Sequence, residues 1–319
     1  MDVSPSVYEH AAFLIGCTPW EVSRSADLLF RAHATAYRTY RHAPIMPGID
    51  IYNLEAEAYG AVLEAPWETA VPAVRPFLEE TAALLELPRF DPATDGRIPM
   101  QIAVAGRLRE AFPDADIRVP IAGPFSIAAN LVGFDRLLLE AATDPSLVRK
   151  ALLHLVDAQV GFAAAVKEAG VDVTFFESAA CPPLLSPSQF RRIELPALSE
   201  IMIRIAEVVG HPIPCIIGGN TTPIIEPLLE MGTGYLICPF ETDQSAFLEK
   251  VRNRTEVRVR VNCDLRIIQR GPWEAIRAES DRVIALAKSR ENTCVGTGSL
   301  AYDTPTAHVL RLMDHVRKA

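Results

Sequence analysis

The feature that most constrains the fold is a repeated alternation of amphipathic helices with short apolar strands. Helices are expected at residues 145–169, 187–209 and 223–231, and each runs into a glycine. Glycine commonly ends a helix because it adopts the left-handed conformation of the C-terminal cap at little cost. A short run rich in β-branched residues follows soon after each of these glycines. This order is typical of parallel strands whose sheet is covered by helices.

About seven or eight such units can be counted along the chain. The expected strands span residues 45–52, 117–122, 171–176, 212–217, 235–238, 257–261 and 293–297, and further helices are expected at 54–62, from 126 onwards, and at 244–252, 272–289 and 305–317. This count, in a chain of 319 residues, favours an α/β fold of the (β/α)8 TIM-barrel type over an open sheet. No Gly-x-Gly-x-x-Gly follows the first strand, which disfavours a dinucleotide-binding sheet.

The residues before this repeat have a different pattern. Residues 4–42 are expected to be helical, and Thr18-Pro19-Trp20-Glu21 has the composition of a capped helix start. We therefore expect a helical extension over residues 1–44 and a barrel over residues 45–319, within one domain overall.

Composition excludes several classes of protein. With 31 Lys and Arg against 40 Asp and Glu, the net charge is −9, which disfavours nucleic acid as a partner. No apolar run approaches the ~20 residues of a membrane span, and no signal peptide is visible. We expect a cytoplasmic protein without a membrane partner. A hydrophobic content of 49% and the N-terminal helices make a homodimer reasonable.

Polar residues recur where the expected strands end, which is where barrel enzymes place their active sites. Asp50 is notable because an acid within an apolar strand is costly to bury unless it is paired or useful. Gly218 and Gly219 would let the backbone approach a ligand. Each of these residues could also be an ordinary turn residue. The candidate site residues are Asp50, Asn53, Glu55, Glu57, Asn130, Glu177, Gly218, Gly219, Asn220, Glu241, Asn262, Asp264, Thr297 and Ser299.

Several segments at these strand ends carry a family resemblance. They are residues 48–60, Ala122-Gly-Pro-Phe-Ser126, residues 185–190, Gly219-Asn-Thr-Thr-Pro-Ile224, Asn262-Cys-Asp264 and residues 296–305. In this order and spacing, the chain resembles the uroporphyrinogen decarboxylase superfamily, which includes cobalamin-linked methyltransferases. The resemblance implies a (β/α)8 barrel.

Departures from the family patterns bear on the subfamily. The resemblance places the zinc ligands of the methyltransferases at Ile216, Gly218 and Ser299, so all three ligand side chains are missing. The arginine-rich segment with which the decarboxylase binds its tetrapyrrole has no counterpart before Ile45. Of the decarboxylase signature, only the strand-end aspartate is matched, at Asp50.

The resemblance, with Glu55 and Glu57 after the first strand, favours a methyltransferase that works with a small corrinoid protein. It would move a methyl group between a small methylated donor, such as a methyl ether, and cobalamin on that partner. Asp50, Glu177 or Glu241 could protonate the departing oxygen, and the other candidates would bind substrate or corrinoid. The alternatives are a decarboxylase-like lyase acting on a carboxylated substrate and a catalytically altered homologue.

Six cysteines leave the question of a metal open. Cys215 and Cys294 are expected to be structural, whereas Cys238 and Cys263 follow adjacent strands and form one weak candidate pair for zinc. No histidine is placed after a strand, which disfavours a Ser–His–Asp hydrolase.

Overall fold

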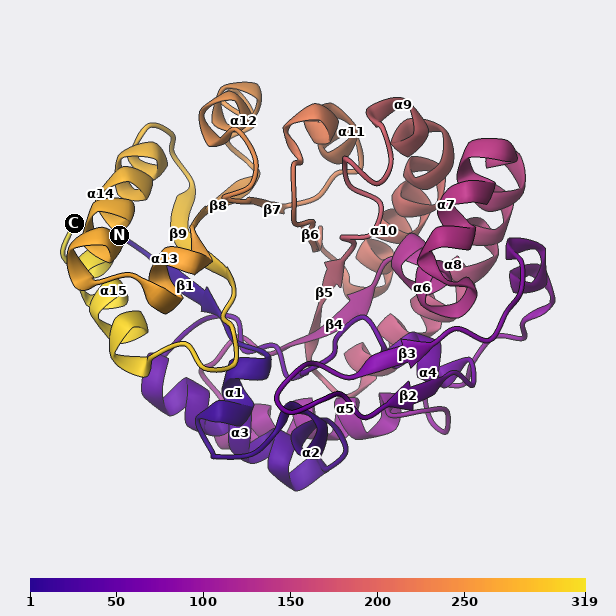
Figure 1. Ribbon diagram of the computed structural model, residues 1–319, viewed down its shortest axis with the longest axis horizontal. Coiled ribbons are helices and arrows are strands. Elements are labelled where there is room, and N and C mark those ends of the chain that lie inside the picture. Colours follow the sequence, from indigo (N-terminus) through magenta and orange to yellow (C-terminus); the bar gives the residue numbers. More distant parts are fainter.

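The computed structural model describes residues 1–319 and contains a seven-stranded parallel sheet that curls into a barrel (Figure 1). The sheet order is β1-β9-β8-β7-β6-β5-β4, so the first strand pairs with the last. The strands are β1 (Val3–Ser6), β4 (Arg118–Ala122), β5 (Asp172–Phe176), β6 (Pro214–Ile216), β7 (Tyr235–Cys238), β8 (Arg258–Cys263) and β9 (Thr293–Ser299). Ile45 makes a parallel bridge to Ile117 beside β4 and occupies the remaining position of the barrel. The predicted TIM-barrel class is confirmed.

Helices surround the sheet and cover its outer face (Figure 1). They are α1 (Glu9–Phe13), α2 (Pro19–Ser23), α3 (Ala26–Tyr40), α4 (Leu54–Ala58), η1 (Thr81–Glu86), α5 (Ile98–Ala111), α6 (Pro124–Val132), α7 (Phe134–Thr143), α8 (Pro145–Glu168), α9 (Pro187–Gln189), η2 (Phe190–Glu194), α10 (Leu195–Val209), η3 (Thr222–Ile224), α11 (Ile225–Glu230), α12 (Gln244–Lys250), α13 (Leu265–Arg270), α14 (Trp273–Lys288) and α15 (Thr306–Lys318). A separate hairpin pairs β2 (Val62–Glu64) with β3 (Ala73–Arg75). None of the helices combines the length and apolarity needed to cross a bilayer.

The N-terminal region differs from the expected helical extension. Residues 3–6 form the first strand of the barrel, although Val-Ser-Pro-Ser carries no apolar run that would indicate a strand. The helices α1 to α3 follow, and the expected start of α2 is present, with the Thr18 hydroxyl accepting a hydrogen bond from the Glu21 amide. The N-terminal region therefore contributes to the sheet as well as to the helical layer.

The strand expected at residues 45–52 is reduced to the bridge at Ile45. Pro44 and Pro47 have no backbone N–H to donate to a neighbouring strand. Gly48, at φ +147°, also leaves the geometry of a strand. The predicted strand was therefore wrong in its length, but it marked the correct place in the barrel.

Side-chain alternation divides the core in two. On β8, Val259, Val261 and Cys263 point outward and pack under the helices. Inside the barrel, six residues form a separate apolar group, the lumen layer: Tyr8, Met46, Ile51, Phe176, Ile216 and Ile237. One cavity lies at the carboxyl ends of the strands and another at their amino ends, and residues of the lumen layer line both.

Candidate functional site

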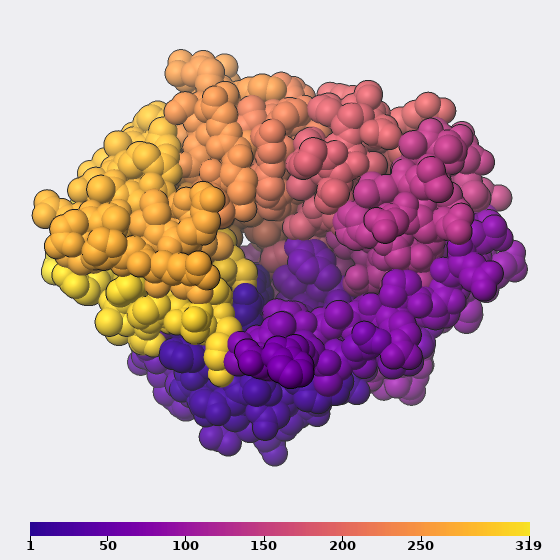
Figure 2. Space-filling view, viewed as in Figure 1, coloured from indigo at the N-terminus to yellow at the C-terminus, as the bar shows by residue number.

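The cavity at the carboxyl ends of the strands, called here the mouth cavity, has a volume of about 350 Å³. Residues at or just beyond the ends of six strands line it: Ser6, Phe176, Ile216, Pro239, Asn262 and Ser299. Figure 2 shows the hollow at the centre of this face. Its size is within the range of small-molecule sites, and its position is the one that barrel enzymes use.

Aromatic side chains form much of the wall of the mouth cavity. The ring of Phe176 makes edge-to-face contacts with Tyr8 and Tyr52, at centroid distances of 6.1 and 6.3 Å. The Tyr52 hydroxyl lies 2.7 Å from the Ser178 hydroxyl, and both residues line the cavity. Burial raises the pKa of both phenols, so they remain neutral and can take part in hydrogen bonds.

Asp50 lines the mouth cavity, but its carboxylate is fully engaged. Arg97, which directly precedes α5, donates one hydrogen bond to each of its oxygens, and Asn53 donates a further one at 3.2 Å. Arg97 also pairs with Glu57. With hydrogen bonds from Arg97 on both oxygens and from Asn53 on one of them, the carboxylate has no free position from which to serve a leaving group. The structure therefore argues against the predicted role of Asp50 as a proton donor and assigns it to anchoring the loop.

Glu177 does not line the mouth cavity, which contradicts the prediction that it acts there. Its side chain is fully buried and accepts hydrogen bonds from the backbone amides of Phe125 and Ser126, in the first turn of α6. Burial raises its pKa. Burial and the neighbouring Glu177 raise the pKa of Glu194 further, so Glu194 carries the proton of this pair. Glu177 thus holds a helix end in the core.

Glu241 is the one predicted acid that stands free at the cavity. It lines the mouth cavity just beyond β7 and takes part in no ion pair. Glu241 is exposed overall, but partial desolvation of its carboxyl raises its pKa, an effect that a backbone hydrogen bond and the charge of Arg266 offset only in part. A raised pKa keeps a carboxyl protonated closer to neutral pH, as a general acid requires.

The remaining predicted binding residues divide into two groups. Asn53, Gly218, Asn262 and Ser299 line the mouth cavity, whereas Glu55, Glu57, Asn130, Gly219, Asn220, Asp264 and Thr297 do not. Several of the second group have structural partners instead. Glu55 accepts a hydrogen bond from the Ala122 amide, and Asp264 caps α13 and pairs with Arg266.

The positions at which the family resemblance places zinc ligands do come together. Ile216, Gly218 and Ser299 all line the mouth cavity, but isoleucine and glycine side chains have no atom that can ligate a metal. Cys238 and Cys263 are fully buried in the core outside the lumen, and no three His, Cys, Asp or Glu side chains form a group suited to a metal. These residues do not fit a zinc ion held in the manner of the family.

The site contains residues that sequence reasoning missed. Arg260 and Tyr8 line the mouth cavity, and Arg97 supports it from behind. An available signal was Arg258-x-Arg260-x-Asn262, in which polar residues alternate with valines along a strand. This alternation places all three side chains toward the lumen.

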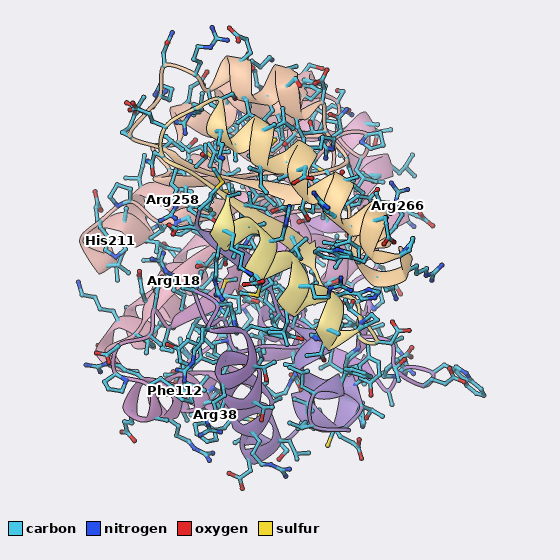
Figure 3. The ribbon with its side chains drawn as sticks, turned by 90° about the vertical axis from the view of Figure 1, so that its left-hand side faces the viewer. Arg38, Phe112, Arg118, His211, Arg258 and Arg266 are labelled. Carbon is cyan, nitrogen blue, oxygen red and sulfur yellow. The ribbon has the colours of Figure 1, made fainter.

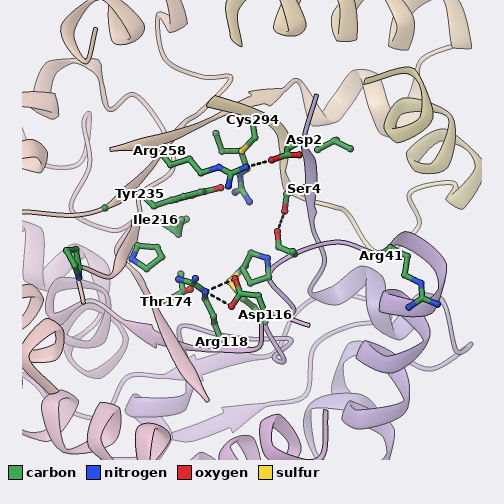
Figure 4. A pocket seen from close by; sticks show the side chains of 18 of the residues that line it. Asp2, Ser4, Arg41, Asp116, Arg118, Thr174, Ile216, Tyr235, Arg258 and Cys294 are labelled. Carbon is green, nitrogen blue, oxygen red and sulfur yellow. Dashed lines mark hydrogen bonds and ion pairs between the residues drawn. The ribbon is translucent and has the colours of Figure 1, made fainter. Parts of the chain in front are cut away.

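The second cavity, at the amino ends of the strands, has a volume of about 560 Å³ (Figure 4). Its wall includes the ion pairs Asp2–Arg258 and Asp116–Arg118. Cys294 also lines it, so this thiol faces the lumen. Figure 3 separates the two faces, with Arg118, His211 and Arg258 on one side and Arg266 on the other. Catalytic groups of barrel enzymes gather at the opposite end, so the mouth cavity is the candidate active site.

Comparison with known proteins agrees with this architecture. The family model described as uroporphyrinogen decarboxylase (URO-D) matches residues 5–319. No curated protein matches the chain. Among solved structures, a methyltransferase from Methanosarcina mazei has a TM-score of 0.83 at 19% sequence identity, over 99% of this chain and 92% of that one. At this identity, the likeness shows a shared fold.

Proposed function

Because the chain belongs to the uroporphyrinogen decarboxylase (URO-D) family, we propose that it is an enzyme of the methyltransferase type found in that superfamily. It moves a methyl group between a small methylated donor, such as a methyl ether, and a corrinoid carried by a small partner protein. The observation that carries the proposal is the composition of the mouth cavity: apolar walls, one cation and two acids outside any ion pair. Of these two acids, Glu9 accepts a hydrogen bond from the Ser299 hydroxyl, whereas Glu241 has no side-chain partner. The fold likeness to a methyltransferase supports it.

The same cavity is poorly suited to the family's namesake substrate. A tetrapyrrole with eight carboxylates needs several cations, but Arg260 is the single Lys, Arg or His side chain among the residues lining the mouth cavity. Glu9, Asp50 and Glu241 line it too and would repel further negative charge. Asp50, the one match to the decarboxylase signature, is held by Arg97.

The proposed chemistry is a displacement at the methyl carbon. The reduced corrinoid, when its carrier docks, supplies the nucleophile that takes the methyl group. This chain positions the donor among Phe176, Ile237 and Phe240, so that the methyl group faces the open end of the cavity. As the bond between the methyl carbon and its oxygen breaks, Glu241 gives its proton to that oxygen, which leaves as a hydroxyl group. No step is assigned to zinc, because the residues do not fit it.

A docking partner would approach the carboxyl-end face, where the mouth cavity opens. The β2–β3 hairpin lies beside this opening, and Val71 and Pro72 from its connecting loop line the cavity. Trp67 in the same loop is 85% exposed, which is unusual for tryptophan. An exposed aromatic residue at the rim of a site is a common anchor for a protein partner.

The test combines the purified protein, a carrier protein loaded with reduced corrinoid, and a panel of methyl ethers. Methyl transfer should change the visible spectrum of the corrinoid. We expect Glu241→Gln to slow this change about a hundredfold or more. Glu230→Gln, which alters an exposed carboxyl in an ion pair with Arg191, is the matched control and should have no effect. No spectral change with any donor, together with release of carbon dioxide from a tetrapyrrole, would establish the decarboxylase alternative instead.

A further inference from the structure

One buried cation in the mouth cavity has no carboxylate partner in the protein. Arg260 is only 3% exposed and takes part in no ion pair. Its Nε–H donates a hydrogen bond to Asn262 Oδ1 at 3.1 Å, and its two terminal nitrogens have no acceptor within the chain. A guanidinium group carries five N–H donors, so most of those on Arg260 are left for something else.

Two other buried arginines have structural roles, and the guanidinium group of each is bound by several acceptors of the protein. Arg97 binds Asp50, Glu57 and the Ser23 carbonyl oxygen. Arg290 donates to a series of backbone carbonyl oxygens, including those of Val251 and Val257. Burying an unpaired charge costs several kcal/mol, and cations in protein interiors are normally satisfied in this way. Arg260 is the exception. It lines both cavities, and its one side-chain hydrogen bond is to Asn262, which lines the mouth cavity and not the amino-end cavity.

The neighbouring strand is shaped to admit the Arg260 side chain. Gly296 on β9 lies against its stem, and a Cβ atom at position 296 would come within 2.7 Å of Arg260 Cγ. The hydrogen bond to Asn262 fixes the guanidinium from the side. The phenols of Tyr8 and Tyr235 lie close enough for the charge of Arg260 to act on both of them. The surrounding residues therefore hold the Arg260 side chain in a defined place, which a freely moving surface arginine would not have.

We propose that Arg260 binds a carboxylate of the substrate, and that the substrate is a small monocarboxylate with an apolar, methyl-bearing body. A guanidinium with free terminal N–H groups matches a carboxylate through two parallel hydrogen bonds. One negative charge is indicated because Arg260 is the single cation lining the mouth cavity, while three acids line it as well. The aromatic and aliphatic walls receive the rest of the molecule. The methyl-bearing part of this assignment rests on the proposed function, whereas the carboxylate part does not.

The test measures binding without any methyl transfer. Isothermal titration calorimetry and thermal shift would compare 4-methoxybenzoate and methoxyacetate with their neutral amides. We expect the acids to bind the natural protein and the amides to bind at least tenfold more weakly. Arg260→Gln should lose about tenfold or more in affinity for the acids and leave the amides unchanged. The control is Arg252→Gln, an exposed arginine paired with Glu249 that does not line the mouth cavity, which should keep the natural affinities.

The stability of the variants separates binding from a structural role. Because Arg260 lacks a partner, Arg260→Gln without ligand should unfold at the same urea concentration as the natural protein, or a higher one. The proposal is overturned if no carboxylate binds, if acids and amides bind equally, or if Arg260→Gln keeps its affinity for the acids. Binding that depends on Arg260 without methyl transfer would refute the proposed function alone. Transfer from neutral ethers without carboxylate binding would refute this inference alone.

Discussion

Arg97 and Asp50 meet through two hydrogen bonds, of 2.9 Å from Nη1 to Oδ1 and 2.6 Å from Nη2 to Oδ2. Both side chains are almost completely buried. The pair joins the residue before α5 to the loop beyond Ile45, and it fixes one wall of the mouth cavity.

Breaking this pair should destabilise the protein strongly. Arg97→Gln leaves the buried Asp50 charge without its cation and should lower the free energy of unfolding by about 3–5 kcal/mol. Asp50→Asn should cost less, because Arg97 keeps its ion pair with Glu57. Urea denaturation measures this change. Breaking the exposed Arg191–Glu230 pair with Glu230→Gln should cost less than about 1 kcal/mol. If the double variant lost the sum of the two single losses, the two residues would not be coupled.

Methyl transfer should depend on pH through Glu241. Its pKa is raised by partial burial, and the protonated carboxyl is the active form, so the rate should fall as pH rises through that pKa. Rates of corrinoid methylation at a series of pH values measure this limb of the profile. Glu241→Gln should abolish the limb along with most of the rate. An unchanged limb in Glu241→Gln would assign the proton to another group.

Two glycine substitutions should have opposite effects. A Cβ atom on Gly123 would lie 2.7 Å from Glu177 Cβ, in a fully buried site, so Gly123→Ala should destabilise the protein by about 1–3 kcal/mol. Gly161 lies within α8, and a Cβ atom there would meet no neighbouring group within 4 Å. Gly161→Ala should stabilise the protein by about 0.5–1 kcal/mol, because alanine favours helix. Thermal unfolding of both variants provides the comparison.

Ionisation of Glu55 should make the natural protein less stable as pH rises. Burial raises the pKa of Glu55 to about 7, and its Oε2 atom has no hydrogen-bond partner. The folded state therefore binds more protons than the unfolded state between about pH 4.5 and pH 7. The stability that Glu55 contributes to the free energy of unfolding is fully present below about pH 4.5, and roughly 3 kcal/mol of it is lost as pH rises to about 7.

Glu55→Gln removes this titration and isolates its effect. The variant should gain stability relative to the natural protein as pH rises from 5 to 8, as measured by urea unfolding at each pH. Other titrating groups contribute equally to both proteins and cancel in the difference. A difference that stays constant with pH would show that Glu55 is ionised in the folded state throughout.

Much of the barrel could be predicted because parallel strands and their helices leave a strong periodic signal. The strand at Tyr235–Cys238 was predicted with its observed bounds. The strand at Val3–Ser6 was missed because its pairing with β9 depends on residues almost 300 positions away, and nothing local favours it. Position along a strand predicted which residues approach the mouth cavity. It could not reveal which other groups in the protein already bind their side chains. Thus Arg97 neutralises Asp50 and α6 engages Glu177, while Arg260 is left free.

The pairing of β1 with β9 also sets the order in which the barrel can be completed. The Ser6 amide donates to Thr297 Oγ1 across a separation of 291 residues. During synthesis, β1 must wait until β9 has been made before it can pair. Residues 3–6 therefore join the sheet only after β9 has been made, although they precede it by almost 300 residues. Closing the ring carries a large loop-closure entropy, which makes it a natural late step in folding.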